Sequence, residues 1–168
     1  SEDSMAVGIA TIQKLLEEAE AHSPLCVRIV ATGAVREASN GKDFAERVRK
    51  STGHSVAILS GEEEATGIAA GLATDPALDG LTDFLACDLG GGSLELILVT
   101  NRQATAKTSL PLGAVLLTER FIADADARIH TTETDAITAH VRETLTGSGF
   151  PFPESPPLIV ATGGTFVI

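Results

Sequence analysis

The sequence predicts an α/β protein in which mixed sheets are flanked by helices. Short β-branched runs alternate with segments of helical periodicity, and neither Trp nor Tyr occurs among the 168 residues. A chain of this length buries roughly two thirds of the surface that its unfolded form exposes, so it needs no disulfide or metal for stability. The core is expected to consist of Ile, Leu, Val and Ala, which suits strands covered by helices.

The first half of the chain is predicted to alternate helices with strands. Apolar residues at steps of three and four indicate helices, and short runs rich in β-branched residues indicate strands. Gly53 suits a left-handed cap at a helix C-terminus. The β-α-β-α order predicts a parallel or mixed sheet. In order, the predicted elements are a helix over 4–22, a strand over 25–32, a helix over 40–52, a strand over 55–59 and a helix after the acidic turn 60–64.

The second half is predicted to contain four strands and two helices. A break over 74–80 carries Asp, Pro and Gly and is the predicted boundary between domains over 1–78 and 79–168. Four prolines within 150–157 indicate a rigid connection rather than an element. In order, the predicted elements are strands over 84–87, 94–99 and 104–109, helices over 114–122 and from 131 onward, and a strand over 158–161.

Composition and charge exclude several classes of protein. The net charge of −11 argues against a nucleic-acid binder, because such proteins need cationic side chains to displace counterions from phosphates. No run approaches the roughly 18 to 20 apolar residues of a membrane span, and the N-terminus has no basic region, so a cytoplasmic protein without membrane contact is expected. Cys26 and Cys87 lie in separate apolar runs, which predicts two buried thiols in a reducing compartment.

A glycine-rich segment over 88–93 follows a predicted strand. Three consecutive glycines let the backbone approach a ligand and turn successive N–H groups toward phosphate oxygens. Asp88 is placed to hold a hydrated Mg²⁺, and Glu95 is a second carboxylate nearby. The alternative interpretation is a glycine-rich hairpin without a ligand. Asp88 and Ser93, which flank the glycines, favour phosphate.

An acidic triplet and a cluster of basic residues are further candidates. Glu62, Glu63 and Glu64 begin a predicted helix, where they can interact with its dipole or supply a base for an attacking water; composition does not choose among them. Half of the twelve Lys and Arg residues lie within 28–50, which indicates either a polyanion groove or solvated helix faces. Arg36 is the best candidate because it follows the end of a predicted strand.

Five motifs in chain order resemble the exopolyphosphatase/guanosine pentaphosphate phosphatase family. This family implies an actin-like, ribonuclease-H-like fold of two related α/β domains with the active site between them. Each domain is represented in part, because the family's first phosphate loop has no counterpart before Ser4 and the chain stops at 166–168 after a glycine turn. The motifs are ATGAVREA (31–38), SGEEEA (60–65), DLGGGSLE (88–95), SLPLGAV (109–115) and ATGGT (161–165).

The resemblance also implies roles for single residues. Glu64, directly before the alanine, matches the catalytic base, and Asp88 and Glu95 match the acidic residues around the metal and the attacking water. Leu116 departs from the family's usual arginine, and Leu94 and Gly33 are smaller departures. The residues implied to bind phosphate are Arg36, Gly90, Gly91, Gly92, Ser93, Gly163 and Gly164.

By similarity, the reaction is Mg²⁺-dependent hydrolysis of the terminal phosphate of inorganic polyphosphate, with Mn²⁺ as an alternative metal. A guanosine pentaphosphate 5′-phosphohydrolase is a second hypothesis that no residue distinguishes from the first. A non-catalytic polyphosphate- or nucleotide-binding module is a third, motivated by the absent first loop and by Leu116. A sugar or acetate kinase is a fourth, supported only by the Gly163–Gly164 turn as an adenosine site. The family also favours a homodimer.

Overall fold

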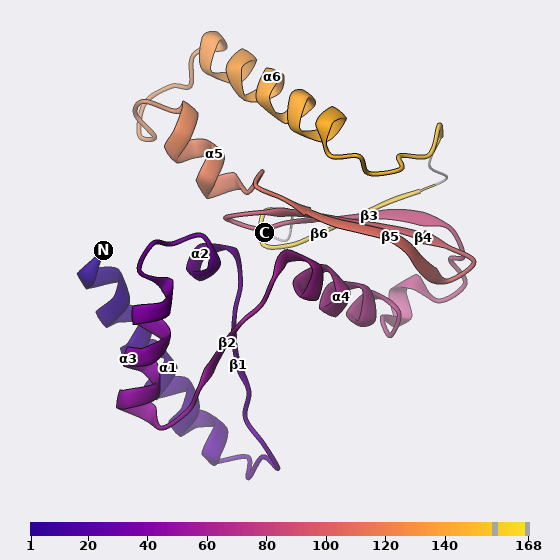
Figure 1. The fold of residues 1–168 in the computed structure, drawn as a ribbon. Helices are drawn as coiled ribbons and strands as arrows, with labels where there is room; N and C mark the ends of the chain where they lie inside the picture. Colours follow the sequence, from indigo (N-terminus) through magenta and orange to yellow (C-terminus); the bar gives the residue numbers. More distant parts are fainter. Residues whose placement is uncertain (156–157, 167–168) are drawn as a thin grey trace. The chain divides into compact units, whose positions relative to one another are not determined.

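The computed structural model describes residues 1–155 and 158–166. Their contacts divide the chain into two compact units, Ser1–Ser60 and Gly61–Ile168 (Figure 1). The first unit contains α1 (Glu2–Glu20), β1 (Ile29–Ala31), α2 (Gly33–Arg36), α3 (Gly41–Thr52) and β2 (Val56–Ile58). The second contains α4 (Gly61–Leu72), the 3-10 turn η1 (Pro76–Leu78), β3 (Phe84–Leu89), β4 (Leu94–Thr100), β5 (Gln103–Leu110), α5 (Ala114–Phe121), α6 (Thr131–Gly147) and β6 (Ile159–Thr162).

In the first unit, α1 and α3 pack on each other and β1 pairs with β2 in parallel. Met5 of α1 and Val48 of α3 are its buried apolar side chains. The predicted cap is confirmed, because Gly53 ends α3 in the left-handed conformation with φ 76°. β1 is shorter than the predicted strand 25–32, and Cys26, which precedes it, is exposed. The prediction of a buried thiol is therefore wrong for Cys26, whereas Cys87 is half-buried.

The second unit is built on one four-stranded sheet with the order β5-β4-β3-β6. β3, β4 and β5 are antiparallel neighbours, and β6 joins the sheet parallel to β3. The mixed sheet and its helices follow the predicted elements closely. The prolines at 156 and 157 lie outside the described residues, so the predicted rigid connection is described only up to residue 155.

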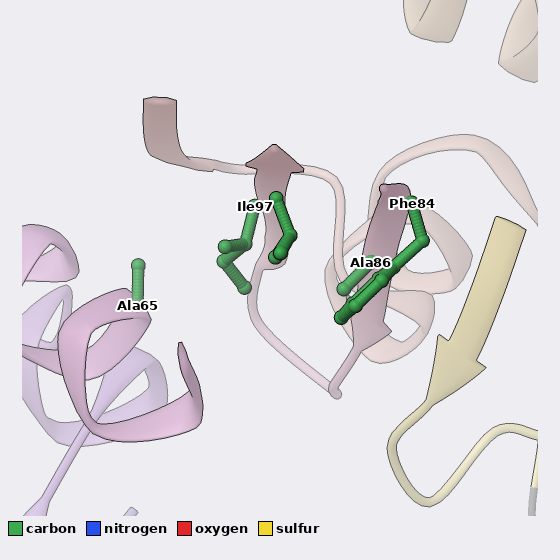
Figure 2. Close-up of a cluster of buried hydrophobic side chains, with 5 residues drawn as sticks. Ala65, Phe84, Ala86 and Ile97 are labelled. Carbon is green, nitrogen blue, oxygen red and sulfur yellow. The ribbon is translucent and has the colours of Figure 1, made fainter. Parts of the chain in front are cut away.

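Helices cover both faces of this sheet, as Figure 1 shows for α4 on one side and α5 and α6 on the other. Side chains of a strand alternate between the two faces, and the central strands β3 and β4 therefore contribute to two cores. Figure 2 shows the core under α4, a buried cluster that includes Ala65, Phe84, Ala86 and Ile97. The core under α6 contains, among its buried residues, Leu85, Leu96, Leu110, Leu112 and Phe150.

The helix α4 belongs to the second compact unit because it packs on β5 and β4. The contact division at Ser60 and Gly61 therefore falls before the domain boundary that the sequence predicts after residue 78. That boundary, with its domains over 1–78 and 79–168, stays a prediction. Among the described residues, no helix combines the length and the apolar character needed to cross a membrane.

Candidate active site

Two carboxylates meet at one end of the sheet in the second unit. Asp88 lies near the end of β3, directly opposite Glu95 of β4 and beside Thr162 of β6. Directly opposed residues of antiparallel strands carry their side chains on the same face. By strand alternation, Asp88 and Glu95 share the face of Ala86 and Ile97, which is the face that α4 covers. Both carboxylates therefore lie on the α4 side of the sheet.

The first turn of α4 is seated against Ser109 of β5. A Cβ added to Gly61 would lie 2.6 Å from the Ser109 Cβ, so only glycine allows this approach. Ser109 is the register partner of Glu95, and its Oγ donates a hydrogen bond of 2.6 Å to Glu95 Oε1. Glu64, in this same turn, is close enough for its charge to act on both Asp88 and Glu95. The paired carboxylates of β3 and β4 thus lie within reach of the charge of a third carboxylate from α4.

The electrostatics of this cluster follow from burial. Glu95 is only 1% exposed, and desolvation raises its pKa; hydrogen bonds from Ser109 and Ser93 act in the opposite direction, and the charges of Glu64 and Asp88 raise it again. Desolvation also raises the pKa of Asp88, with the Glu64 charge as the second cause. Carboxylates that repel one another in this way favour a bound proton or a cation between them.

The glycine loop connects β3 to β4 beside these carboxylates. The N–H of Gly90 donates to the Ser93 carbonyl at 3.0 Å, which closes the turn, and Ser93 itself is buried. Among the described residues, the N–H groups of Gly91 and Gly92 have no hydrogen-bond acceptor. Two backbone donors are therefore available next to the carboxylates, as phosphate binding requires.

The turn after β6 lies against the end of β3. Gly163 has φ 96°, and a Cβ there would lie 2.6 Å from the Leu89 carbonyl oxygen and 2.8 Å from Asp88 Oδ1. Thr165 Oγ1 donates to the Leu89 carbonyl at 3.1 Å and holds the turn in place. Gly164 follows in an open position, with no atom within 4 Å of an added Cβ. The ends of the parallel strands β3 and β6 thus bring the Gly163–Gly164 turn beside Asp88.

Arg36 belongs to the first unit, at the end of α2. Its Nη1 donates to the Leu59 carbonyl at 3.0 Å, and its Nε pairs with Glu37. Three of the four basic residues of α3 that were candidates for a polyanion groove are paired with acids: Arg47 with Glu2 and Asp43, Arg49 and Lys50 with Glu46. Arg49 and Lys50 together lower the pKa of Glu46 to about 2. These pairs favour the interpretation of α3 as a solvated helix face.

Mg²⁺ is the metal that the family resemblance implies at these carboxylates. Among residues 1–155 and 158–166, no group of three or more His, Cys, Asp or Glu side chains is arranged to hold a metal ion. Mg²⁺ does not require such a group, because it commonly keeps several waters and uses one or two carboxylates with substrate phosphates. Half-buried Asp88 suits this role, whereas Glu95 is buried and accepts the Ser109 hydrogen bond. The donor set fits a hydrated ion held through Asp88.

Sequence reasoning assigned no individual role to Gly61, Ser109 or Gly113. Ser109 and Gly113 belong to the SLPLGAV motif and Gly61 belongs to the SGEEEA motif, so their place in these motifs was the only indication in the sequence that they support the site. Their roles depend on which backbones lie close together, and only the register of β4 and β5 reveals that Ser109 is opposite Glu95.

Comparison with known proteins identifies a matching family and similar solved structures. A family model described as the Ppx/GppA phosphatase family matches residues 1–164. The chain is similar to the solved structure of an exopolyphosphatase from Cytophaga hutchinsonii, with 26% identity and a TM-score of 0.77 over 86% of this chain and 46% of that one. It is also similar to the Aquifex aeolicus PPX-GPPA enzyme, with 28% identity and a TM-score of 0.69 over 98% of this chain and 52% of that one.

A third solved structure, of an exopolyphosphatase-like protein, has 23% identity and a TM-score of 0.85 over 98% of this chain and 52% of that one. These similarities confirm the predicted α/β fold of the actin-like class. The chain spans about half the length of these solved structures.

Proposed function

The chain belongs to the Ppx/GppA phosphatase family, and we propose that the whole protein is an exopolyphosphatase that hydrolyses the terminal phosphate of inorganic polyphosphate. The observation that carries this proposal is the pairing of Asp88 with Glu95 across β3 and β4, within reach of the Glu64 charge and beside a glycine loop with two available N–H donors. The similar protein from Cytophaga hutchinsonii, which is named an exopolyphosphatase, supports the same substrate.

In the proposed reaction, Glu64 is the general base. A water oxygen attacks the terminal phosphorus, the bond from that phosphorus to the bridging oxygen breaks, and the water's proton moves to the Glu64 carboxylate. The products are orthophosphate and a chain shortened by one phosphate. A base in this role needs to reach the water by a hydrogen bond. The proposal assigns it to Glu64 because this residue, directly before the alanine of the SGEEEA motif, matches the family's base and its charge reaches Asp88 and Glu95.

The other residues of the cluster receive supporting roles. Glu95, fixed by Ser109, is proposed to orient the attacking water. The N–H groups of Gly91 and Gly92 are proposed to bind oxygens of the terminal phosphate. Asp88 would hold Mg²⁺, or Mn²⁺ in its place, and the ion would neutralise charge on those oxygens. Arg36 stays a predicted contact of the polyanion.

The test is phosphate release from long-chain polyphosphate in the presence of Mg²⁺. We expect Glu64→Gln to abolish release while polyphosphate binding persists, because glutamine keeps the shape of the side chain but accepts no proton. Glu62→Gln is the matched control: this side chain lies in the same helical turn, is 81% exposed, and is expected to leave release unchanged. A reaction without added metal, with chelator, is the second control.

Two outcomes would contradict the proposal. Unchanged release by Glu64→Gln would remove the residue from the base role, and saturable polyphosphate binding without release by the unaltered protein would favour the non-catalytic binding module. Competition between polyphosphate and guanosine pentaphosphate in the same assay decides between the two phosphatase substrates. Preferential hydrolysis of guanosine pentaphosphate would replace the substrate and keep the chemistry.

A further inference from the structure

The glycine loop is in backbone contact with the residue that precedes α5. A Cβ added to Gly113 would overlap backbone atoms of Gly91 and Gly92. Because the atoms it would meet are main-chain atoms, no side-chain rotation could relieve the overlap. Gly113 itself is buried, with φ −66° and ψ 152°, a conformation open to any residue. Glycine is therefore needed at 113 for space and not for backbone geometry.

The first turn of α5 holds the loop by two hydrogen bonds. The N–H of Ala114 donates to the Gly90 carbonyl at 2.9 Å, and the N–H of Leu116 donates to the Gly91 carbonyl at 3.0 Å. The first N–H groups of a helix have no partner within the helix, so these donors are free to bind carbonyl groups from outside it. The contact uses the Leu116 backbone, which makes it independent of the departure from arginine at this position.

This docking fixes which way the loop presents its polar groups. The carbonyls of Gly90 and Gly91 are taken up by α5, while the N–H groups of Gly91 and Gly92 have no acceptor among the described residues. A loop whose carbonyls are held on one side can offer its N–H groups to an anion without exposing carbonyl oxygens that would repel it. Docking on α5 thus favours a loop that is formed before the substrate binds.

We propose that the first turn of α5 is the scaffold of the phosphate loop and that Gly113 is the positioning residue that lets the two backbones meet. The inference rests on the proposed function for its catalytic consequence, since it concerns how the phosphate seat is held. Gly113 acts through Gly91 and Gly92 and has no contact with the reacting atoms in this scheme.

The first variant is Gly113→Ala, measured in the intact protein. We expect the hydrogen-exchange protection of the Leu116 amide to fall at least about tenfold, because the added methyl group moves the loop and takes the Gly91 carbonyl away from the Leu116 N–H. We expect kcat/KM for polyphosphate to fall about a hundredfold, the scale of an ångström-sized misplacement in an active site. Gly147→Ala is the matched control: it lies at the end of α6 with no atom within 4 Å of an added Cβ, and both quantities should stay unchanged.

The second variant, Ala114→Pro, removes the first hydrogen bond without breaking the helix. Proline is favoured at the first position of a helix, and Gly113 already has the extended conformation that a residue before proline prefers. The proline ring replaces the N–H that points at the Gly90 carbonyl, so the loop has to move away. This variant gives the answer if Gly113→Ala does not fold, as judged by circular dichroism, and we expect the same two losses from it.

The two readouts separate this inference from the proposed function. Retained Leu116 protection in a folded Gly113→Ala or Ala114→Pro variant would overturn the scaffold, and lost protection with unchanged kcat/KM would overturn the positioning role. If the unaltered protein releases no phosphate, the proposed function fails. In that case the protection measurement still decides whether α5 holds the loop, because it needs no turnover.

Discussion

Replacing Ser109 by alanine tests whether Glu95 is held as an ionised, hydrogen-bonded carboxylate. The Ser109 hydroxyl donates to Glu95 Oε1 at 2.6 Å, and the Glu95 side chain is 1% exposed, so water does not replace the lost donor. A hydrogen bond to a charged acceptor contributes about 2 kcal/mol to stability, against about 1 kcal/mol for a neutral pair. We therefore expect Ser109→Ala to cost about 2 kcal/mol, and about 1 kcal/mol when Glu95 is already glutamine.

The chain lacks Trp and Tyr, so fluorescence offers no convenient probe. Hydrogen exchange of β4 amides reports the opening of the second unit alone, which matters because the chain forms two compact units. The four proteins of the cycle, wild type, both single variants and the double variant, should be compared at the same pH in an alkaline series, because burial raises the pKa of Glu95 and the carboxyl group has to be ionised. A serine-to-alanine cost that is equal in the two backgrounds would refute the charged hydrogen bond.

Two further predictions concern the same end of the sheet. Burial raises the pKa of Glu95 above its usual 4.5, so the folded protein binds this proton more tightly than the unfolded chain does. The free energy of unfolding that Glu95 contributes is therefore lost as pH rises through the folded pKa. Glu95→Gln should flatten this decline when unfolding is measured as a function of pH, and an equally steep decline would contradict the prediction. Gly163→Ala should lower the midpoint of thermal unfolding, because φ is 96° and the added Cβ would lie 2.6 Å from a carbonyl oxygen. Gly164→Ala is the control, since its added Cβ meets no atom within 4 Å. Equal midpoints for the two variants would contradict the prediction and show that the turn rearranges to accept the added carbon.

The sequence patterns predicted the residues of the candidate site, but they did not predict the contacts that support those residues. The DLGGGSLE motif predicted that Asp88 and Glu95 flank a loop between two strands, and the structure places them opposite each other in the β3–β4 register. Ser109 could not be given its role, because that depends on the pairing of β5 with β4, which local patterns do not specify. Gly113 escaped notice for a similar reason, since its constraint comes from atoms of the glycine loop.

The sequence predicted most helices and strands of the fold, but it predicted less well which of them pack together in one unit. The apolar positions within 65–72 indicated a helix after the acidic turn, but periodicity does not say which sheet the helix packs on, and α4 packs on β4 and β5 of the second unit. The short helix α2 is absent from the predicted elements because four residues carry no periodicity. The β-branched run at 25–32 predicted a longer strand than β1, because the parallel partner β2 offers only three residues for pairing.

The pairing of β6 with β3 has a consequence for the order in which the molecule is built. β3, β4 and β5 are consecutive hairpin neighbours, whereas β6 reaches β3 only after β5, α5 and α6 have been traversed. Closing so long a stretch costs chain entropy before any pairing is gained, and parallel pairs between distant segments form slowly for that reason. Until β6 arrives, the edge of β3 is uncovered and Asp88 lacks its neighbouring glycine turn. The candidate active site is therefore complete only once β6, which is distant from β3 in the sequence, has joined the sheet.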